Sequence, residues 1–487
     1  MVLSLPSLLL LAFPVGVGAI WLLPRADWAR WVALATGAAG LLISLAILFA
    51  FDPARADFQM MERMAWMPSL GVHYLVGLDG ISVLFLPIGS LLLVGAIVAS
   101  WDRVQAAPRL YYSLLLLQAA TLLGVFCALD VVLFVAFMSL AILPAYLLLS
   151  HGGVGPNAKR VARKYAQLML AGMLPVLLGL LAFVVGHATA TGGLAFDLPS
   201  LMQGAVPQPL ALAAFLLLLF GFGLRAPMFP LHAWLPALAM EGPTAVLGLS
   251  AGMNVGIYGL LRFAVPLAPQ VAQELHGLIA GLGVAGLLYG ALLALAQTNL
   301  RAMLAYVGLA QTGLVLLGIA AFNLQGTQGA VLHLLGLAVT MGGLFLAADL
   351  VHKRMGTTEL AGLGGLQKTM PRLAGLFLLF ALAAIALPAT VGFPAVLLVL
   401  VSAIQTHTGA ALLALVGMVP LAACLLLAYR AIFLGRAAVP SAGTDVHPRE
   451  LAMLVVLALL VLAAGLFPSL VLDLIRPAAE LWIARLG

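Results

Sequence analysis

Long apolar runs separated by short polar connections dominate the chain. Residues 81–100, 110–129 and 131–150 hold no charged side chain, and each run reaches the roughly 20 residues that a helix needs to cross a bilayer. The ten-residue alternation typical of membrane β-barrel strands does not occur in them. The pattern therefore predicts an all-α integral membrane protein with about fourteen transmembrane helices. The spans are expected near residues 2–23, 31–51, 81–100, 110–129, 131–150, 164–186, 208–225, 243–265, 275–297, 302–322, 329–351, 373–403, 409–435 and 451–474.

Composition supports a chain whose main solvent is lipid. Of 487 residues, 64% are hydrophobic and 8% are charged, whereas about a quarter are charged in an ordinary soluble domain. We expect a single polytopic domain over residues 1–487. Cys127 and Cys424 both fall inside apolar runs, which predicts packing roles, and the sequence has no metal-ligand spacing, so no metal site is expected.

The basic residues indicate an orientation. Most of the 22 lysines and arginines fall in connections that follow odd-numbered spans, for example Lys159 to Lys164, Lys353 with Arg354, and Arg430, Arg436 and Arg449. Positively charged connections stay on the cytoplasmic side. Both termini are therefore expected on the outer, periplasmic side of a bacterial inner membrane. Orientation also explains the net charge of +6 better than nucleic-acid binding does.

Two proline-rich stretches interrupt the helical pattern at membrane depth. Pro227, Pro230 and Pro236 follow span seven, and Pro388 and Pro394 lie in span twelve. Such interruptions free backbone groups, which lipid cannot satisfy. We predict that helices 7 and 12 are discontinuous and belong to two inverted five-helix repeats, near residues 110–250 and 275–435. The alternative is that the prolines merely bend packed helices.

Several ordered motifs carry a resemblance to a known family. The motifs are Gly77-Leu-Asp-Gly-Ile-Ser82, Leu129-Asp-Val-Val-Leu-Phe134, Pro144-Ala-Tyr146, Pro227-Met-Phe-Pro-Leu-His-Ala-Trp-Leu-Pro236, Pro243-Thr-Ala, Gln297-Thr-Asn-Leu-Arg301, Ala305-Tyr306, Gly364-Gly-Leu, Met370-Pro371, Leu387-Pro388 and Gly392-Phe393. With these motifs the sequence resembles the antiporter-like membrane subunits of respiratory complex I, most of all chain M, within the superfamily that includes Mrp antiporters. The resemblance covers nearly the whole chain.

The resemblance implies a row of ionisable groups at mid-membrane, which this chain largely lacks. In the family, a glutamate on span five drives the pKa of a lysine on span seven, and further lysines and histidines relay the proton. The matching positions here are Ser139, Arg225 and, after a short contraction of the sequence, Asn254; the later ones are Gln311, Leu337 and Val396. An arginine cannot replace a switching lysine, because it stays charged throughout any cycle.

Seven residues are nevertheless candidates for an ion pathway. They are Arg225, His232, His333, Ser139, Asn254, Glu241 and Asp349. Histidines can relay protons near neutral pH, and Arg225 could hold an anion or organise water. The plainer readings are that Arg225 is a snorkelling arginine at the cytoplasmic face and that the histidines pack. Asp79 and Asp130 are expected to cap helices or to pair with a neighbouring subunit.

The leading functional hypothesis is a membrane-arm subunit of a complex-I-like assembly. It would couple redox or partner-driven energy to proton or ion translocation, or would be a degenerate subunit that no longer pumps. No redox or dinucleotide motif is present, so no catalytic residue and no bound cofactor are expected, and quinone or NADH would act only through partner subunits. The alternatives are the membrane subunit of an inorganic-carbon uptake complex, favoured by Asn254 and Arg225, a multisubunit cation/proton antiporter, and a structural scaffold.

Overall fold

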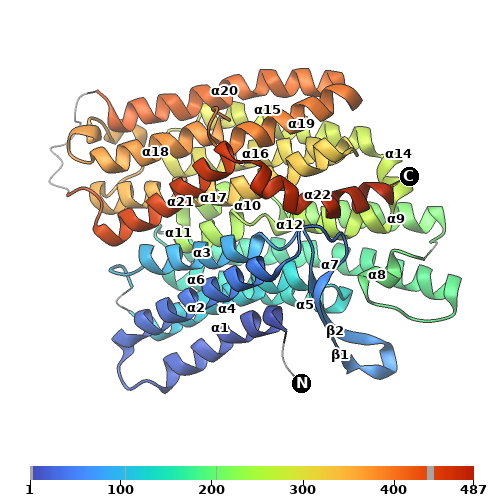
Figure 1. Ribbon diagram of the computed structural model, residues 1–487. Helices are drawn as coiled ribbons and strands as arrows, with labels where there is room; N and C mark the ends of the chain where they lie inside the picture. The colour runs from blue at the N-terminus through green and yellow to red at the C-terminus, as the bar shows by residue number, and fades with distance from the viewer. Residues whose placement is uncertain (1–3, 105, 205, 436–443, 487) are drawn as a thin grey trace.

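The chain folds into a bundle of nearly parallel helices (Figure 1). The computed structural model describes residues 4–104, 106–204, 206–435 and 444–486, so Arg436 lies outside the described residues. Within them, 11 helices are long and apolar enough to cross a membrane, which confirms the predicted class. These are α1 (Leu5–Leu22), α2 (Ala29–Ala50), α4 (Pro108–Cys127), the pair α5 (Val131–Leu140) and α6 (Ile142–Gly152), α7 (Ala158–Thr191), α9 (Gln208–Arg225), α15 (His276–Leu295), α16 (Leu300–Ala320), α17 (Leu324–Met355), α20 (Thr408–Phe433) and α21 (Pro448–Leu466).

Shorter elements complete the bundle. Four apolar segments of 10–17 residues are α3 (Phe85–Ala99), a segment over Val255–Leu267, α18 (Pro371–Ala384) and α19 (Gly392–Thr406). Further short α-helices are α8 (Leu198–Leu201), α10 (Trp234–Glu241), α14 (Pro269–Glu274) and α22 (Ser469–Ala484). Single 3-10 turns cover Ala26–Trp28, Pro68–Leu70, Leu360–Gly362 and Leu366–Lys368.

A β-hairpin is an element that the apolar pattern does not predict. Strands β1 (Gln59–Met67) and β2 (Val72–Leu78) pair antiparallel, and the chain turns at Gly71, whose φ is 74°. Only a residue without a side chain adopts that angle readily. The hairpin extends from the right-hand part of the bundle (Figure 1). Asp130, the N-cap of α5, accepts a 3.1 Å hydrogen bond from the backbone of His73, which joins the hairpin to the helices.

Helices α16 and α17 form the centre of the bundle. In the most apolar stretch of 18 residues, 94% of the residues of α16 and 100% of those of α17 are buried. Outer helices instead expose large apolar side chains, among them Phe49 on α2 and Val419 on α20. In a soluble protein such surfaces would be unstable, whereas in a bilayer they meet acyl chains. Any chemistry in this chain is therefore expected beside α16 and α17.

The two predicted interruptions occur at the expected places. Helix α9 ends at Arg225 and α10 begins at Trp234, while α18 ends at Ala384 and α19 begins at Gly392. Pro227, Pro230 and Pro388 lie in these gaps. Pro236 and Pro394 do not: each lies in the first turn of the following helix, where no backbone N–H donor is needed.

Span eight is also interrupted, which corrects the expectation of a continuous helix over residues 243–265. A short α11 (Thr244–Val246) leads into a π-helical turn, η3 (Leu247–Ala251). Asn254 then adopts a left-handed conformation with φ 39°, before α12 (Val255–Gly259), a second π-helical turn η4 (Leu260–Ala264) and α13 (Val265–Leu267). Wide turns of this kind often mark functional positions in helices.

Candidate ion pathway

Arg225 is held by backbone carbonyls. Its Nη2 donates to the carbonyl oxygen of Met138 at 2.9 Å, and its Nη1 donates to that of Met169 on α7 at 3.5 Å. Met138 lies in the last turn of α5, where carbonyls have no helical donor. Ser139 follows directly in the chain. Ser139 and Arg225 are therefore close in space, and Arg225 is bound by the neutral carbonyl of the residue before Ser139.

Asn254 is linked to the central helix α16. Its Nδ2 donates to Oγ1 of Thr312 at 3.0 Å, and the Thr312 hydroxyl donates onward to the carbonyl of Gly308 at 2.9 Å. Asn254 is almost fully buried. The left-handed backbone turn places the side-chain amide of Asn254 against α16. The hydrogen bond that this amide donates to Thr312 stabilises the interruption of span eight.

Gln311, next to Thr312, continues the polar row. Its Nε2 donates to the carbonyl of Ala384, the last residue of α18, so that the amide satisfies a group freed by the gap in helix 12. The Gln311 Oε1 lies 2.8 Å from Nε2 of His333 on α17. Because that oxygen can only accept, His333 carries its proton on Nε2 and donates. We call Asn254, Thr312, Gln311 and His333 the neutral polar row.

A small cavity adjoins the neutral polar row. It measures about 10 Å³ and is lined by Gln311, His333, Thr340 and Ala384 together with apolar residues. This volume is close to the minimum that a single water molecule occupies. The gap in helix 12 therefore opens onto a space of one water rather than onto a channel.

His232 lies apart from this row, in the gap between α9 and α10. It is buried, and its ring faces Tyr289 at 5.1 Å and Tyr306 at 6.2 Å between centroids. Its Nδ1 has no hydrogen-bond partner among the described residues. His232 is thus surrounded chiefly by aromatic rings.

The two candidate carboxylates are engaged near helix ends. Glu241, at the end of α10, accepts a 2.9 Å hydrogen bond from the backbone N–H of Asn157, just before α7. Asp349 is buried near the end of α17 and pairs with Arg103 at 2.8 Å. Neither arrangement joins a carboxylate to the neutral polar row.

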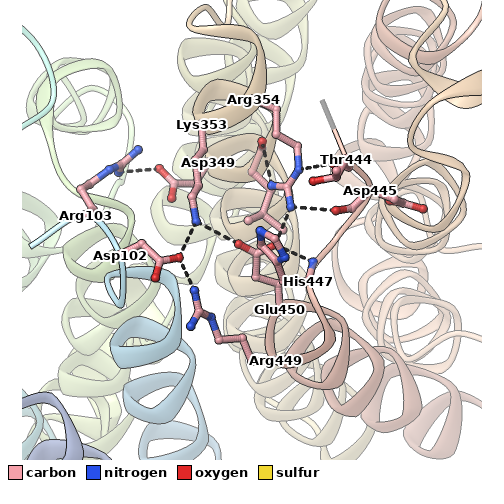
Figure 2. Close-up of polar contacts among 11 residues, drawn as sticks. Asp102, Arg103, Asp349, Lys353, Arg354, Thr444, Asp445, His447, Arg449 and Glu450 are labelled. Atoms are coloured by element: carbon pink, nitrogen blue, oxygen red, sulfur yellow. Dashed lines mark hydrogen bonds and ion pairs between the residues drawn. The ribbon is translucent and has the colours of Figure 1, made fainter. Parts of the chain in front are cut away.

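Asp349 belongs to a cluster of charges that the sequence analysis did not anticipate (Figure 2). Lys353 lies 3.1 Å from both Asp102 and Glu450, and Arg354 pairs with Glu450 at 2.6 Å. Arg449 also contacts Asp102. Burial alone would raise the pKa of Asp102, but hydrogen bonds from Arg449 and Lys353 hold that pKa below its usual range. The cluster ties the connection after α3 to α17 and α21.

A buried pair at the opposite end was also missed. Arg262, in η4, donates to the two carboxylate oxygens of Asp79 at 2.5 and 2.8 Å. Asp79 was expected to cap a helix or to pair with a neighbouring subunit. It accepts a 3.0 Å hydrogen bond from the backbone of Ser82, while its charge partner is in its own chain. Asp130 caps α5 through the backbone of Val132 at 2.8 Å.

Comparison with known proteins identifies a matching family and similar proteins. Residues 128–421 match the family described as NADH:quinone oxidoreductase/Mrp antiporter, transmembrane region. NADH-quinone oxidoreductase subunit M of Rhodobacter capsulatus is 34% identical, with 93% of this chain and 90% of that protein covered. An NAD(P)H-quinone oxidoreductase chain 4 of a Synechococcus strain is 35% identical, covering 96% of this chain and 90% of that protein.

Solved structures agree in fold. A chain of respiratory complex I from Thermus thermophilus matches with a TM-score of 0.89 and 31% identity, covering 98% of this chain and 100% of that one. A chain of the Mrp complex from a Dietzia species reaches a TM-score of 0.86 at 24% identity, covering 99% and 100%. The family match, the similarity to these relatives and the common fold lead to one conclusion: this chain belongs to the NADH:quinone oxidoreductase/Mrp antiporter family of membrane proteins.

Proposed function

We propose that this chain is a membrane-arm subunit of a complex-I-like assembly in the bacterial inner membrane, and that it does not pump protons by switching the charge of a glutamate–lysine pair. The first part is supported by the similarity to subunit M of quinone oxidoreductases over nearly the whole chain. The second part rests on one observation, the guanidinium of Arg225 bound to the carbonyls of Met138 and Met169.

The physical argument concerns which groups can change charge. Arg225 remains a cation at any pH that the protein meets, and its carbonyl acceptors remain neutral. All 16 carboxylates lie among the described residues, and none of them accepts a hydrogen bond from the neutral polar row. His333 is the row's one titratable member, and its proton is committed to Gln311. Arg225 and the neutral polar row therefore make polar contacts without a carboxylate that could drive a charge switch.

The test compares variants of the whole assembly in vesicles. Arg225→Gln keeps a donor for the Met138 carbonyl and removes the charge. We expect the number of protons translocated per electron to be unchanged, since this charge takes no part in a cycle. The matched control is Arg225→Lys, which restores a titratable cation. A lower proton yield in Arg225→Gln, with all subunits still assembled and electron transfer at the normal rate, would overturn the proposal.

We further propose a topology of about fourteen crossings in which the charge cluster of Figure 2 faces the cytoplasm and both termini face outward. The two gaps, after α9 and after α18, lie in corresponding parts of the proposed inverted repeats near residues 110–250 and 275–435. Single cysteines at Gly71 and Gly356 test the sidedness. An impermeant thiol reagent added outside intact cells should label position 71 alone; labelling of position 356 would reverse the orientation.

Partners and cofactors follow from the same proposal. The relatives in solved structures are chains of multisubunit complexes, which supports a hetero-oligomeric setting with other membrane subunits around the exposed apolar helices. Quinone and NADH would then contact partner subunits, and this chain would act on the energy that those subunits release.

A further inference from the structure

Two histidines from distant parts of the sequence meet at one end of the bundle. His276 is the first residue of α15, and His407 lies between α19 and α20. The Nδ1 atom of His276 and the Nε2 atom of His407 are 2.5 Å apart, and the ring planes form an angle of 59°. His276 is exposed and His407 is half-buried. The turn between α19 and α20 lies on the right in Figure 1, near α14 and opposite the charge cluster of Figure 2.

The hydrogen bonds around His407 determine which nitrogen is free to bind a ligand. The hydroxyl of Thr406 donates to the carbonyl of Ser402 at 3.2 Å, so its oxygen must accept the bond from Nδ1 of His407 at 2.9 Å. The proton of neutral His407 therefore sits on Nδ1. Its Nε2 carries a lone pair, and that lone pair points toward His276.

The close contact of the two rings disfavours the state in which both are protonated. Two imidazolium ions cannot face each other at this distance without strong repulsion. The lone pair on Nε2 of His407 therefore faces His276 as a neutral imidazole nitrogen, which is the form that binds metal ions.

We propose that His276 and His407 form a two-histidine site for a borderline divalent transition-metal ion such as Zn²⁺ or Cu²⁺. Two imidazole nitrogens bound to one tetrahedral ion at about 2.0 Å lie about 3.3 Å apart. The rings must therefore separate by less than about 1 Å, which rotation of the exposed His276 side chain allows. The proton of His276 moves from Nδ1 to Nε2, and the metal ion binds the lone pair that this leaves on Nδ1. No oxidation state changes.

The surroundings provide the rest of a metal site. Thr406 fixes the tautomer and orientation of His407 in the way that outer hydrogen-bond partners usually do for metal ligands. Among the described residues no group of three or more histidine, cysteine or carboxylate ligands gathers, so water must fill the other coordination positions. A bound ion would connect α15 to the second half of the interrupted helix, α19. The sequence alone could not reveal this pair, because its members are 131 positions apart.

The experiment measures Cu²⁺ binding to the intact assembly, purified through a tag that contains no histidine. Electron paramagnetic resonance at one equivalent of Cu²⁺ should show coupling to two imidazole nitrogens, and Zn²⁺ should compete for the site. His276→Gln and His407→Gln should each weaken binding by at least about tenfold. His151→Gln, an exposed histidine on another element, is the matched control and should leave the affinity unchanged.

The double variant distinguishes one shared site from two separate ones. If both histidines bind the same ion, His276→Gln with His407→Gln should bind no more weakly than either single variant. Additive losses would mean that each ring binds alone and would overturn the proposal. Unchanged spectra in the single variants, with thermal unfolding like that of the wild type, would overturn it as well.

Discussion

The Asp79–Arg262 pair allows a quantitative test of what holds the interrupted span eight in place. Both side chains are more than nine-tenths buried, and the pair makes two short hydrogen bonds. The Nε of Arg262 also donates to the hydroxyl of Tyr258 at 3.1 Å. Removing one member of a buried ion pair costs about 3–5 kcal/mol, because the other charge stays buried without a partner. Arg262→Met, which fills similar space, should therefore lower the free energy of unfolding by about 3–5 kcal/mol.

A second substitution distinguishes the cost of leaving the Asp79 carboxylate unpaired from the cost of lost packing. Asp79→Asn keeps an oxygen for the backbone N–H groups that it caps but removes the negative charge. Neutralising both members of a buried pair often costs little. We therefore expect Arg262→Met with Asp79→Asn to recover most of the stability. The matched control is Arg55→Met, whose partner Asp57 lies on the surface with 60% of its side chain exposed; exposed pairs contribute little.

The chain supplies its own reporters for this measurement. Cys127 and Cys424 are free and buried, so a dye that fluoresces on reacting with thiols follows unfolding of the protein in detergent. The unfolding midpoint should rank the proteins with wild type and Arg55→Met highest, the double variant next and Arg262→Met lowest. An Arg262→Met protein that unfolds with the wild type, or a double variant no more stable than the single one, would refute the reasoning.

Two further predictions concern packing and pH. A methyl group on Gly313 would lie 2.3 Å from the carbonyl oxygen of Gly283, so Gly313→Ala should force α15 and α16 apart and cost about 1–3 kcal/mol. Gly281→Ala, which meets open space, should leave the same unfolding midpoint unchanged. Hydrogen bonds from Ser4 hold the pKa of Glu62 below its ordinary value of 4.5. Because the pKa of Glu62 is lower in the folded protein, its stabilising contact with Ser4 is complete above pH 4.5 and is lost as the pH falls through the lowered pKa. Hydrogen-exchange protection in the first turn of α1 should therefore fall over that pH range. Glu62→Gln should abolish this pH dependence.

Sequence reasoning succeeded where the bilayer leaves the backbone few choices. In lipid every backbone group must be paired, so an apolar run of sufficient length becomes a helix. The predicted spans 302–322 and 329–351 correspond to α16 (Leu300–Ala320) and α17 (Leu324–Met355). The gaps around Pro227 and Pro388 were likewise predictable, because proline removes a donor from the helical ladder.

The features that escaped depend on contacts between distant segments. Residues 243–265 are apolar enough to be taken as one span, although they include Asn254 and Arg262. The left-handed turn at Asn254 is stabilised by the hydrogen bond from its amide to Thr312, which lies far away in the sequence. The members of the Asp79–Arg262 pair are 183 positions apart in the sequence. The cluster of Figure 2 joins the connection after α3 to α17 and α21. No local sequence pattern predicts contacts between residues that lie so far apart in the chain.

Arg225 and Gln311 share a structural role at the helix interruptions. Each interruption leaves carbonyls without helical donors, and lipid provides no replacement. Arg225 donates to the carbonyl of Met138 where α5 ends, and Gln311 donates to that of Ala384 where α18 ends. These donors satisfy the backbone whether or not anything titrates. The gaps can therefore persist as structure without any group that changes its charge, which is why broken helices in this chain do not by themselves demonstrate pumping.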